Sequence, residues 1–298
     1  MKLLAPFKHL HARTIYTLTT LLAANQGTYT QSSVHYLFSH GLAASEQQAA
    51  RYTAANKGGS WVHGKGPIII TPPYKAFNYT DAHARFWDTN LAQEEDLVTL
   101  RNAYDSLLKE EKNVENVVIV GVSRGASIAL SLLAQAPAHI RAAVLESPFD
   151  AVDAMLSNHI TKIFRKPHER LVGALHKRVI PKIFRHYRTD GPAPVDAIES
   201  IPLDLPILIV CSRRDGIVPA ESSIAIYKRL RATDHHNAHL LILEKGRHCH
   251  IKRNSPGGIL YRNVAHAFYQ AYRLHHHPDW AAAGHEAFLK TQPNAVER

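Results

Sequence analysis

Residues 116–135 read NVVIVGVSRGASIALSLLAQ, and this stretch decides the fold. Its first five residues are mostly β-branched, which is typical of a buried strand. Its last ten residues are apolar nearly all round, which predicts a buried helix that stops before Pro137. Between them, the five residues 121–125 (GVSRG) favour a sharp turn flanked by glycines. The stretch therefore predicts a strand, a turn and a helix, the unit from which parallel sheets are built.

The same alternation of strands and helices continues on both sides of this unit. Apolar runs rich in β-branched residues predict strands, and apolar residues at helical spacing predict helices. The predicted strands are residues 34–39, 67–71, 116–120, 140–146, 206–211 and 239–244. The predicted helices are residues 45–55, 90–112, 126–135, 222–231 and 259–274. We therefore expect an α/β protein with a mostly parallel central sheet of about six to eight strands and helices on both faces.

One stretch interrupts the alternation, and it defines the expected domain organisation. Residues 151–200 predict a helical cap inserted into a core formed by residues 34–150 and 201–275. Residues 1–33 are assigned to an N-terminal extension and residues 276–298 to a C-terminal tail. The extension resembles a signal peptide in outline, but it is rich in threonine and lacks a small-x-small cleavage site. A short amphipathic helix that covers the sheet edge is the favoured interpretation, with export as the alternative.

Composition excludes several classes of protein. The chain has 298 residues, of which 45% are hydrophobic and 20% charged, so it is neither a disordered tail nor a fibrous repeat. Two cysteines argue against a disulfide framework and favour a reducing, cytoplasmic compartment. No run reaches the roughly 18 apolar residues that would span a bilayer. Membrane association through the surface stays open.

The net charge of +10 is concentrated in one region. Residues 151–190 hold nine Lys or Arg and only three Asp or Glu, a net +6. This basic stretch has three interpretations: a solvated cap surface, a surface that contacts anionic lipid, or a field that steers acidic substrates to a site. Nucleic acid is not favoured as a partner, because neither an RNP-like aromatic motif nor a zinc-finger spacing accompanies the charge.

Three residues at the expected ends of strands form a candidate for nucleophilic catalysis. Ser123 lies in the G-x-S-x-G turn, where Gly121 and Gly125 leave room for a nucleophile elbow. A serine hydroxyl needs a base and the base needs an orienting acid, in the chain order Ser, acid, His on this architecture. Asp215 follows strand 206–211 and His248 follows strand 239–244, so the order fits.

An oxyanion hole is expected beside Ser123. The backbone N–H of Arg124 begins the helix after the turn, and Leu42 lies in the His40-Gly41-Leu42 turn after the first strand. Backbone N–H groups at these two places would bind the developing negative charge.

At this point the sequence resembles the α/β-hydrolase fold over residues 34–274, and within it the serine-aminopeptidase-like hydrolases. The shared motifs are HGL (40–42), GVSRGA (121–126), ESPFD (146–150) and DGIVP (215–219), with a His after the last strand. The resemblance implies hydrolysis of an ester, thioester or amide through an acyl-enzyme. Two departures stand out: Ser212 and Arg247 occupy positions where such proteins usually carry glycine. The roughly 33 residues before the first strand are also too few for the usual two opening strands.

Several residues remain as alternatives. Asp150 is a reserve acid, His250 competes with His248 for the role of base, and Glu146 and Ser147 are expected to shape the pocket floor. Cys211 and Cys249 fit either a disulfide or two thiols, with thiols favoured. The histidines at 275–277 could contact a metal, but a solvated helix end is favoured, and we expect neither a metal nor a cofactor.

The candidate residues predict a serine hydrolase that cleaves a carboxylic ester or acyl thioester of a small or acyl-chain substrate. An aminopeptidase-like peptidase is the closest enzymatic alternative. A hydrolase-like protein without turnover, which docks to a membrane or a partner through its basic cap, is the alternative from another class.

Overall fold

The structure is a computed structural model that describes residues 34–42, 44, 48–49, 52, 69–70, 91–111, 114–164, 169–184, 186–249, 251 and 255–291. Its sheet has six strands in the order β2-β1-β3-β4-β5-β6, and every neighbouring pair is parallel. The strands are β1 (Val34–Ser39), β2 (Ile69–Ile70), β3 (Asn116–Val122), β4 (Ile140–Glu146), β5 (Ile207–Ser212) and β6 (Ala238–Leu243). The predicted parallel α/β sheet is confirmed.

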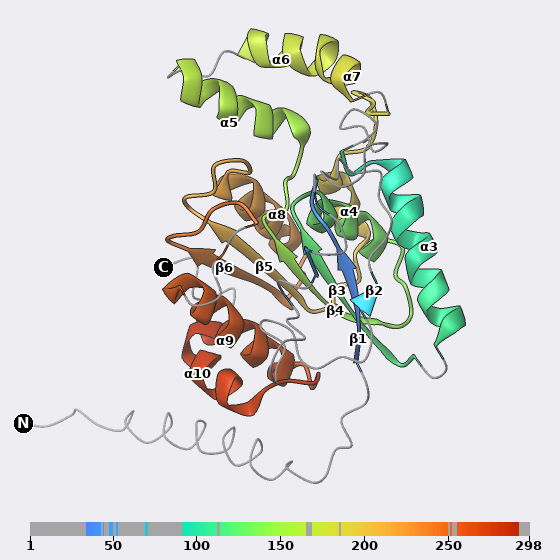
Figure 1. The fold of residues 1–298 in the computed structure, drawn as a ribbon, viewed down its shortest axis with the longest axis vertical. Helices are drawn as coiled ribbons and strands as arrows, with labels where there is room; N and C mark the ends of the chain where they lie inside the picture. Colours follow the sequence, from blue (N-terminus) through green and yellow to red (C-terminus); the bar gives the residue numbers. More distant parts are fainter. Residues whose placement is uncertain are drawn as a thin grey trace, which may run out of the picture. The chain divides into compact units, whose positions relative to one another are not determined.

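Alternate residues of β1, β3, β4, β5 and β6 face two separate apolar cores. Leu37 and Ile119 face the side covered by α3 (Glu94–Glu110), α4 (Arg124–Leu133) and α8 (Ala220–Ala232). Tyr36 and Val118 face the opposite side, which is covered by α9 (Pro256–Ala271) and α10 (Pro278–Leu289). Figure 1 shows these two layers of helices. Strands buried on both faces are mostly apolar, which is why the runs 34–39 and 116–122 do not alternate regularly with polar residues.

Helices α3, α4, α8 and α9 begin two to four residues from their predicted starts, and for α3 and α9 the local reason is clear. Helix α3 begins at Glu94 and not at residue 90, because Leu91 and Ala92 have left-handed φ angles of 53° and 67° and Gln93 is extended. Helix α9 begins at Pro256, before the predicted residue 259, because the Ser255 side chain accepts a hydrogen bond from the backbone N–H of Gly258 (3.1 Å) and caps the first turn.

The stretch assigned to a C-terminal tail contains a helix, α10. Its residues Ala281 and Phe288 are buried against α9. The two helices cross closely at Gly284, where a Cβ atom would lie only 2.0 Å from the carbonyl oxygen of Asn263. Glycine allows this approach, so the helix depends on a tertiary contact that leaves little trace in local sequence.

The chain between β4 and β5 forms the inserted cap. It comprises α5 (Val152–Phe164), α6 (Glu169–Arg178), α7 (Ile180–Ile183) and the 3₁₀ helix η2 (Pro194–Ser200). Strand β4 leads directly into α5, and α5–α7 lie beyond that end of the sheet (Figure 1). The returning chain is held by Gln93, whose side-chain amide donates to the Arg188 carbonyl (2.7 Å) and accepts from the Arg188 N–H (2.8 Å). This pair of hydrogen bonds fixes the end of the cap to the start of α3.

Some predicted features lie outside the described residues. They are the N-terminal extension (1–33), most of the helix expected at 45–55, the flanks of the strand expected at 67–71, and the basic residues Arg165, Lys166 and Arg185. Among the helices that the structure describes, none is long and apolar enough to cross a membrane.

Candidate active site

Ser123 lies at the sharp turn between β3 and α4 in an unusual backbone conformation. Its φ of 53° and ψ of −120° fall in a region that L-residues rarely adopt. Two close approaches force glycine on either side of it. A Cβ at Gly125 would lie 1.9 Å from the carbonyl oxygen of Ser39, and one at Gly121 would lie 2.5 Å from the Cα of Ala126. The glycines of the G-x-S-x-G motif thus let α4 pack against the end of β1 and hold Ser123 in the turn.

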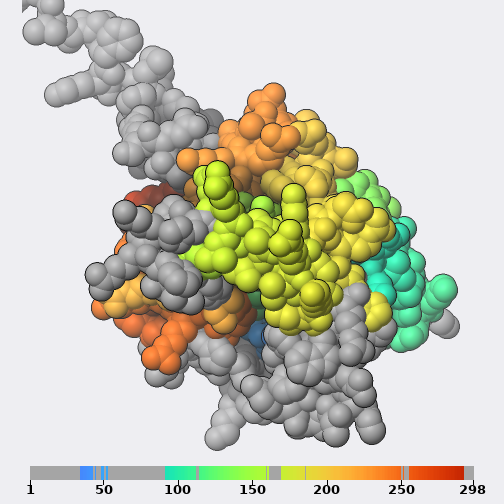
Figure 2. Space-filling model, turned by 90° about the horizontal axis from the view of Figure 1, so that it is seen from above, coloured from blue at the N-terminus to red at the C-terminus, as the bar shows by residue number. Residues whose placement is uncertain are grey.

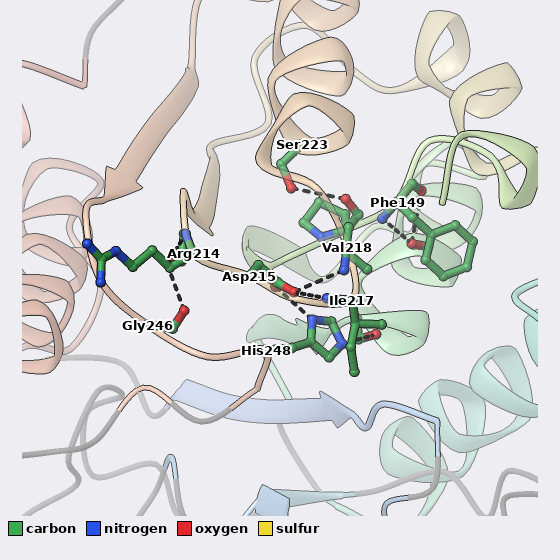
Figure 3. Close-up of polar contacts among 12 residues, drawn as sticks. Phe149, Arg214, Asp215, Ile217, Val218, Ser223, Gly246 and His248 are labelled. Atoms are coloured by element: carbon green, nitrogen blue, oxygen red, sulfur yellow. Dashed lines mark hydrogen bonds and ion pairs between the residues drawn. The ribbon is translucent and has the colours of Figure 1, made fainter. Parts of the chain in front are cut away.

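The structure brings Ser123, His248 and Asp215 into one hydrogen-bonded chain. The distance from Ser123 Oγ to His248 Nε2 is 2.8 Å, and that from His248 Nδ1 to Asp215 Oδ2 is 2.7 Å. Figure 3 shows the imidazole of His248 held against Asp215. The three residues come from turns after β3, β6 and β5, at the carboxyl ends of strands of one parallel sheet.

The environment of Asp215 fixes the tautomer of His248. Burial by itself raises the pKa of Asp215, but the hydrogen bond and charge of His248 and two backbone N–H groups together lower it below its usual value. Those N–H groups, from Ile217 and Val218, donate to Oδ1 at 2.8 and 2.9 Å (Figure 3). Because the carboxylate is ionised and can only accept, His248 carries its proton on Nδ1. Nε2 is therefore free to accept the proton of the Ser123 hydroxyl.

The predicted oxyanion-hole residues lie on both sides of Ser123. Arg124 is the first residue of α4, so its N–H is at the positive end of that helix. Leu42 belongs to the turn after β1, next to Gly41, where a Cβ would lie 3.5 Å from the Ser123 Cβ. The N–H of Gly41 donates to the Gln48 side chain at 2.8 Å, which fixes this turn beside the serine.

Comparison with known proteins assigns the family. The sequence pattern of the prolyl oligopeptidase family (Peptidase_S9) matches residues 90–273, more than half of the chain. The chain belongs to this family. The α/β-hydrolase resemblance is thereby confirmed, and the family supports the serine-hydrolase class. Comparison with curated proteins gives no match.

Solved structures share the fold of this prolyl oligopeptidase family member. An acylaminoacyl peptidase in complex with Z-Gly-Gly-Phe-chloromethyl ketone is 18% identical, with a TM-score of 0.55 over 85% of this chain and 39% of that chain. Acylaminoacyl peptidase from Pyrococcus horikoshii is 19% identical (TM-score 0.53, 81% of this chain and 37% of that chain). An esterase from Pyrococcus furiosus is 17% identical (TM-score 0.53, 81% and 82%). The chain therefore spans less than half the length of these peptidases and most of the length of the esterase.

The side chain of Arg124 pairs with a residue that the sequence did not single out. Its guanidinium is 1% exposed and lies 3.7 Å from the carboxylate of Asp96 at the start of α3. Asp96 also accepts the N–H of Ala92 at 2.9 Å. Burial raises the pKa of Asp96, although the charge of Arg124 and the Ala92 hydrogen bond act in the opposite direction. The side chain after the nucleophile thus anchors the beginning of α3, 28 positions away in sequence, and no local pattern links the two.

Two serines that the sequence did not single out hold the loop after β4 in this family member. The Ser127 hydroxyl bonds both the N–H (2.9 Å) and the carbonyl (3.0 Å) of Phe149, and the Ser223 hydroxyl donates to the Pro148 carbonyl (3.0 Å; Figure 3). Before this loop, the side chain of Glu146 is 1% exposed. Burial raises its pKa to about 8, the charge of Asp215 adds to that rise, and the Tyr52 hydroxyl opposes it.

Ser212, one of the two departures from the usual glycine, joins the acid loop to the base loop. The Ser212 hydroxyl donates to the Gly246 carbonyl at 2.9 Å and accepts the N–H of Arg214 at 3.2 Å (Figure 3). Ser212 comes three residues before Asp215, and Gly246 two residues before His248. This departure from the usual glycine therefore places a hydrogen bond between the two turns that carry the acid and the base.

The structure decides between Asp215 and the alternative acid. The acid that contacts His248 is Asp215 and not Asp150, and His250 lies outside the described residues. Cys211 and Cys249 are thiols and are not joined in a disulfide. His277 precedes α10 and stacks on Trp280, with ring centroids 4.3 Å apart. Among the described side chains, no group of three or more His, Cys, Asp or Glu is arranged to hold a metal ion.

Proposed function

We propose that this protein is a serine hydrolase in which Ser123 is the nucleophile, His248 the general base and acid, and Asp215 the residue that orients His248. One observation carries the proposal: the unbroken hydrogen-bonded chain from Ser123 through His248 to Asp215, with distances of 2.8 and 2.7 Å. The side chains of His248 and Asp215 are 11% and 1% exposed. Partial exclusion of water strengthens the electrostatic interactions among the three groups.

The reaction follows from these positions. Ser123 Oγ attacks the carbonyl carbon of the substrate while its proton moves to His248 Nε2, and the N–H groups of Arg124 and Leu42 bind the oxyanion. The intermediate collapses, the leaving group takes the proton from His248, and an acyl-enzyme remains on Ser123. A water molecule then repeats the sequence, and it releases the carboxylic acid and restores the serine.

The substrate class that we favour is a carboxylic ester or acyl thioester with an apolar acyl group. Three cap side chains, Met155, Leu156 and Ile183, and Leu42 in the turn after β1 are partly buried and pack against the same apolar core. The cap lies beyond the strand ends that carry the catalytic residues, and apolar side chains on it suit an acyl chain (Figure 1). Among the solved structures compared, the Pyrococcus furiosus esterase matches the chain over most of both lengths.

A peptidase is the second candidate, because the chain belongs to the prolyl oligopeptidase family. Cleavage near a free peptide N-terminus requires a carboxylate to bind the α-amino group. Four of the five acids in residues 151–200 are engaged with the protein itself: Asp153 with the N–H of Ala154, Asp190 with Arg188, Asp196 with the N–H of Ala193, and Glu199 with Arg229. The fifth, Glu169, is the first residue of α6. This favours the ester or thioester over an aminopeptidase substrate.

The test is labelling with a fluorophosphonate probe, which reacts with an activated serine. We expect the wild-type protein to be labelled and Ser123→Ala and His248→Ala to be unlabelled, with all three proteins folded by circular dichroism. Ser127→Ala is a matched control, since Ser127 lies on α4 and bonds the backbone of Phe149 and not His248. A folded wild-type protein that is not labelled would refute the proposal and favour the non-catalytic docking alternative.

Substrates then separate the two enzymatic candidates. Hydrolysis rates of p-nitrophenyl esters of rising chain length, acyl-coenzyme A thioesters and aminoacyl p-nitroanilides are compared at equal enzyme concentration. We expect the highest kcat/KM for an ester or thioester. A higher value for an anilide would assign the protein to the peptidases.

A further inference from the structure

The outer face of α6 combines basic and apolar side chains. With about 3.6 residues per turn, Arg170, Leu171, Ala174, Lys177 and Arg178 lie on one face of this helix, and all five are exposed. Val179 and Lys182, which follow the helix in sequence, are exposed as well. These seven residues are referred to below as the α6 patch. The cap helices, in yellow-green and yellow, face the viewer in Figure 2.

The inner face of α6 makes the contacts that pack this helix onto the protein, so the side chains of the α6 patch are not needed for folding. Val172 is buried, and His176 Nε2 lies 2.7 Å from the hydroxyl of Tyr187, which is itself buried. The acid of α6, Glu169, is its first residue and lies on the side away from the patch at this helical spacing. No carboxylate of the helix itself therefore offsets the charges of Arg170, Lys177 and Arg178.

We propose that the α6 patch docks on the surface of an anionic lipid membrane. Four cations, Arg170, Lys177, Arg178 and Lys182, complement the negative headgroups. Leu171 and Val179 are 37% and 38% exposed. Apolar side chains between cations are typical of helices that lie in the interface plane, where they enter the boundary between headgroups and acyl chains. Docking does not require catalysis, so this proposal stands apart from the proposed function.

Nucleic acid fits the same charges less well. Proteins that bind single strands stack bases on exposed aromatic side chains. The α6 patch contains no aromatic residue, and the two nearby aromatic side chains that the structure describes, Phe184 and Tyr187, are buried. Exposed leucine and valine would contribute little to phosphate binding, whereas they add to lipid binding.

The test is cosedimentation of the whole protein with vesicles of phosphatidylcholine and phosphatidylserine, and with vesicles of phosphatidylcholine alone. We expect the wild-type protein to bind the mixed vesicles at low salt, to be released from them at high salt, and not to bind the neutral vesicles. The variant Arg170→Gln/Lys177→Gln/Arg178→Gln should bind on the order of 100-fold more weakly, since each cation near such a surface contributes about fivefold. Leu171→Ser keeps every charge and should still weaken binding several-fold.

The matched control removes three charges elsewhere. Lys109→Gln/Lys228→Gln/Lys290→Gln has the same net charge as the patch variant, but its positions are exposed residues of α3, α8 and the end of α10. Circular dichroism and thermal midpoints show that each variant is folded. The proposal fails if the wild-type protein does not bind the mixed vesicles, or if the control variant loses as much binding as the patch variant. Binding to RNA or duplex DNA without vesicle binding would assign the patch to nucleic acid instead.

Discussion

Glu146 makes the stability of this protein depend on pH in an unusual direction. Its carboxyl lies at the end of β4 with a side chain that is 1% exposed, and burial raises its pKa from 4.5 to about 8. In the unfolded chain the carboxyl ionises above about pH 4.5, whereas in the folded protein it keeps its proton up to about pH 8. Between these values the folded state binds more protons than the unfolded state, so the free energy of unfolding falls as pH rises.

The size of the effect follows from the same two pKa values. Each pH unit between them lowers the free energy of unfolding by about 1.4 kcal/mol. From about pH 4.5 to pH 7 the loss is about 3 kcal/mol. Glu146→Gln has nearly the same shape and no proton to lose. We therefore expect the variant and the wild type to be similarly stable near pH 5 and the variant to be more stable at pH 7, by up to about 3 kcal/mol.

The assay is urea unfolding of both proteins across this pH range, followed by tryptophan fluorescence. Glu115→Gln is the control, because Glu115 is an exposed residue in the loop before β3. It should follow the pH dependence of the wild type throughout. If the stability difference between Glu146→Gln and the wild type is the same at pH 5 and pH 7, Glu146 does not keep its proton in the folded protein and the reasoning fails.

Three further substitutions test other parts of the structure. Burial lowers the pKa of His239 from 6.5 to about 4, so the wild-type protein should lose up to about 3 kcal/mol of stability as pH falls through this range. His239→Gln should lose less stability. Equal acid-unfolding curves for the two proteins would contradict this. Gly125→Ala would place a Cβ 1.9 Å from the Ser39 carbonyl oxygen. We therefore expect misfolding or a fluorophosphonate reaction that is at least 100-fold slower (~3 kcal/mol). Labelling at the wild-type rate would exclude the elbow geometry. Ser212→Ala removes the hydrogen bond to Gly246 and should slow fluorophosphonate labelling about fivefold while the protein stays folded. An unchanged labelling rate would show that this bond has no positioning role.

The parts of the fold that the sequence predicts well are those with a strong local pattern. The strands at 34–39 and 140–146 are buried on both faces over most of their length, so most of their positions are apolar and each run is visible without its partners. The same holds for the turn at 121–125, since the glycines needed for close packing stand within three residues of Ser123. Asp215 and His248 could be predicted to converge with Ser123, because the ends of parallel strands share one edge of the sheet.

The features that the sequence did not predict depend on contacts between distant segments. Helix α10 has few large apolar residues, and its packing rests on the close approach at Gly284. The ion pair of Asp96 with Arg124 joins two helices, and Asp96 reads from the sequence only as one of three acids in a first turn. Hydrophobic periodicity reports which face of an element is buried, but not which polar side chain meets which.

Ser212 and Arg247 stand where such hydrolases usually carry glycine, and the structure explains both residues. Arg247 is exposed, so the position before His248 tolerates a long side chain. Position 246 favours glycine, because a Cβ there would lie 3.2 Å from the Ser212 Oγ, tighter than ordinary contact. Ser212 in turn uses that hydroxyl to bond the Gly246 carbonyl. Serine at 212 and glycine at 246 therefore fit each other in the contact between the turns of Asp215 and His248. A glycine at 212 would remove the hydroxyl that makes this hydrogen bond.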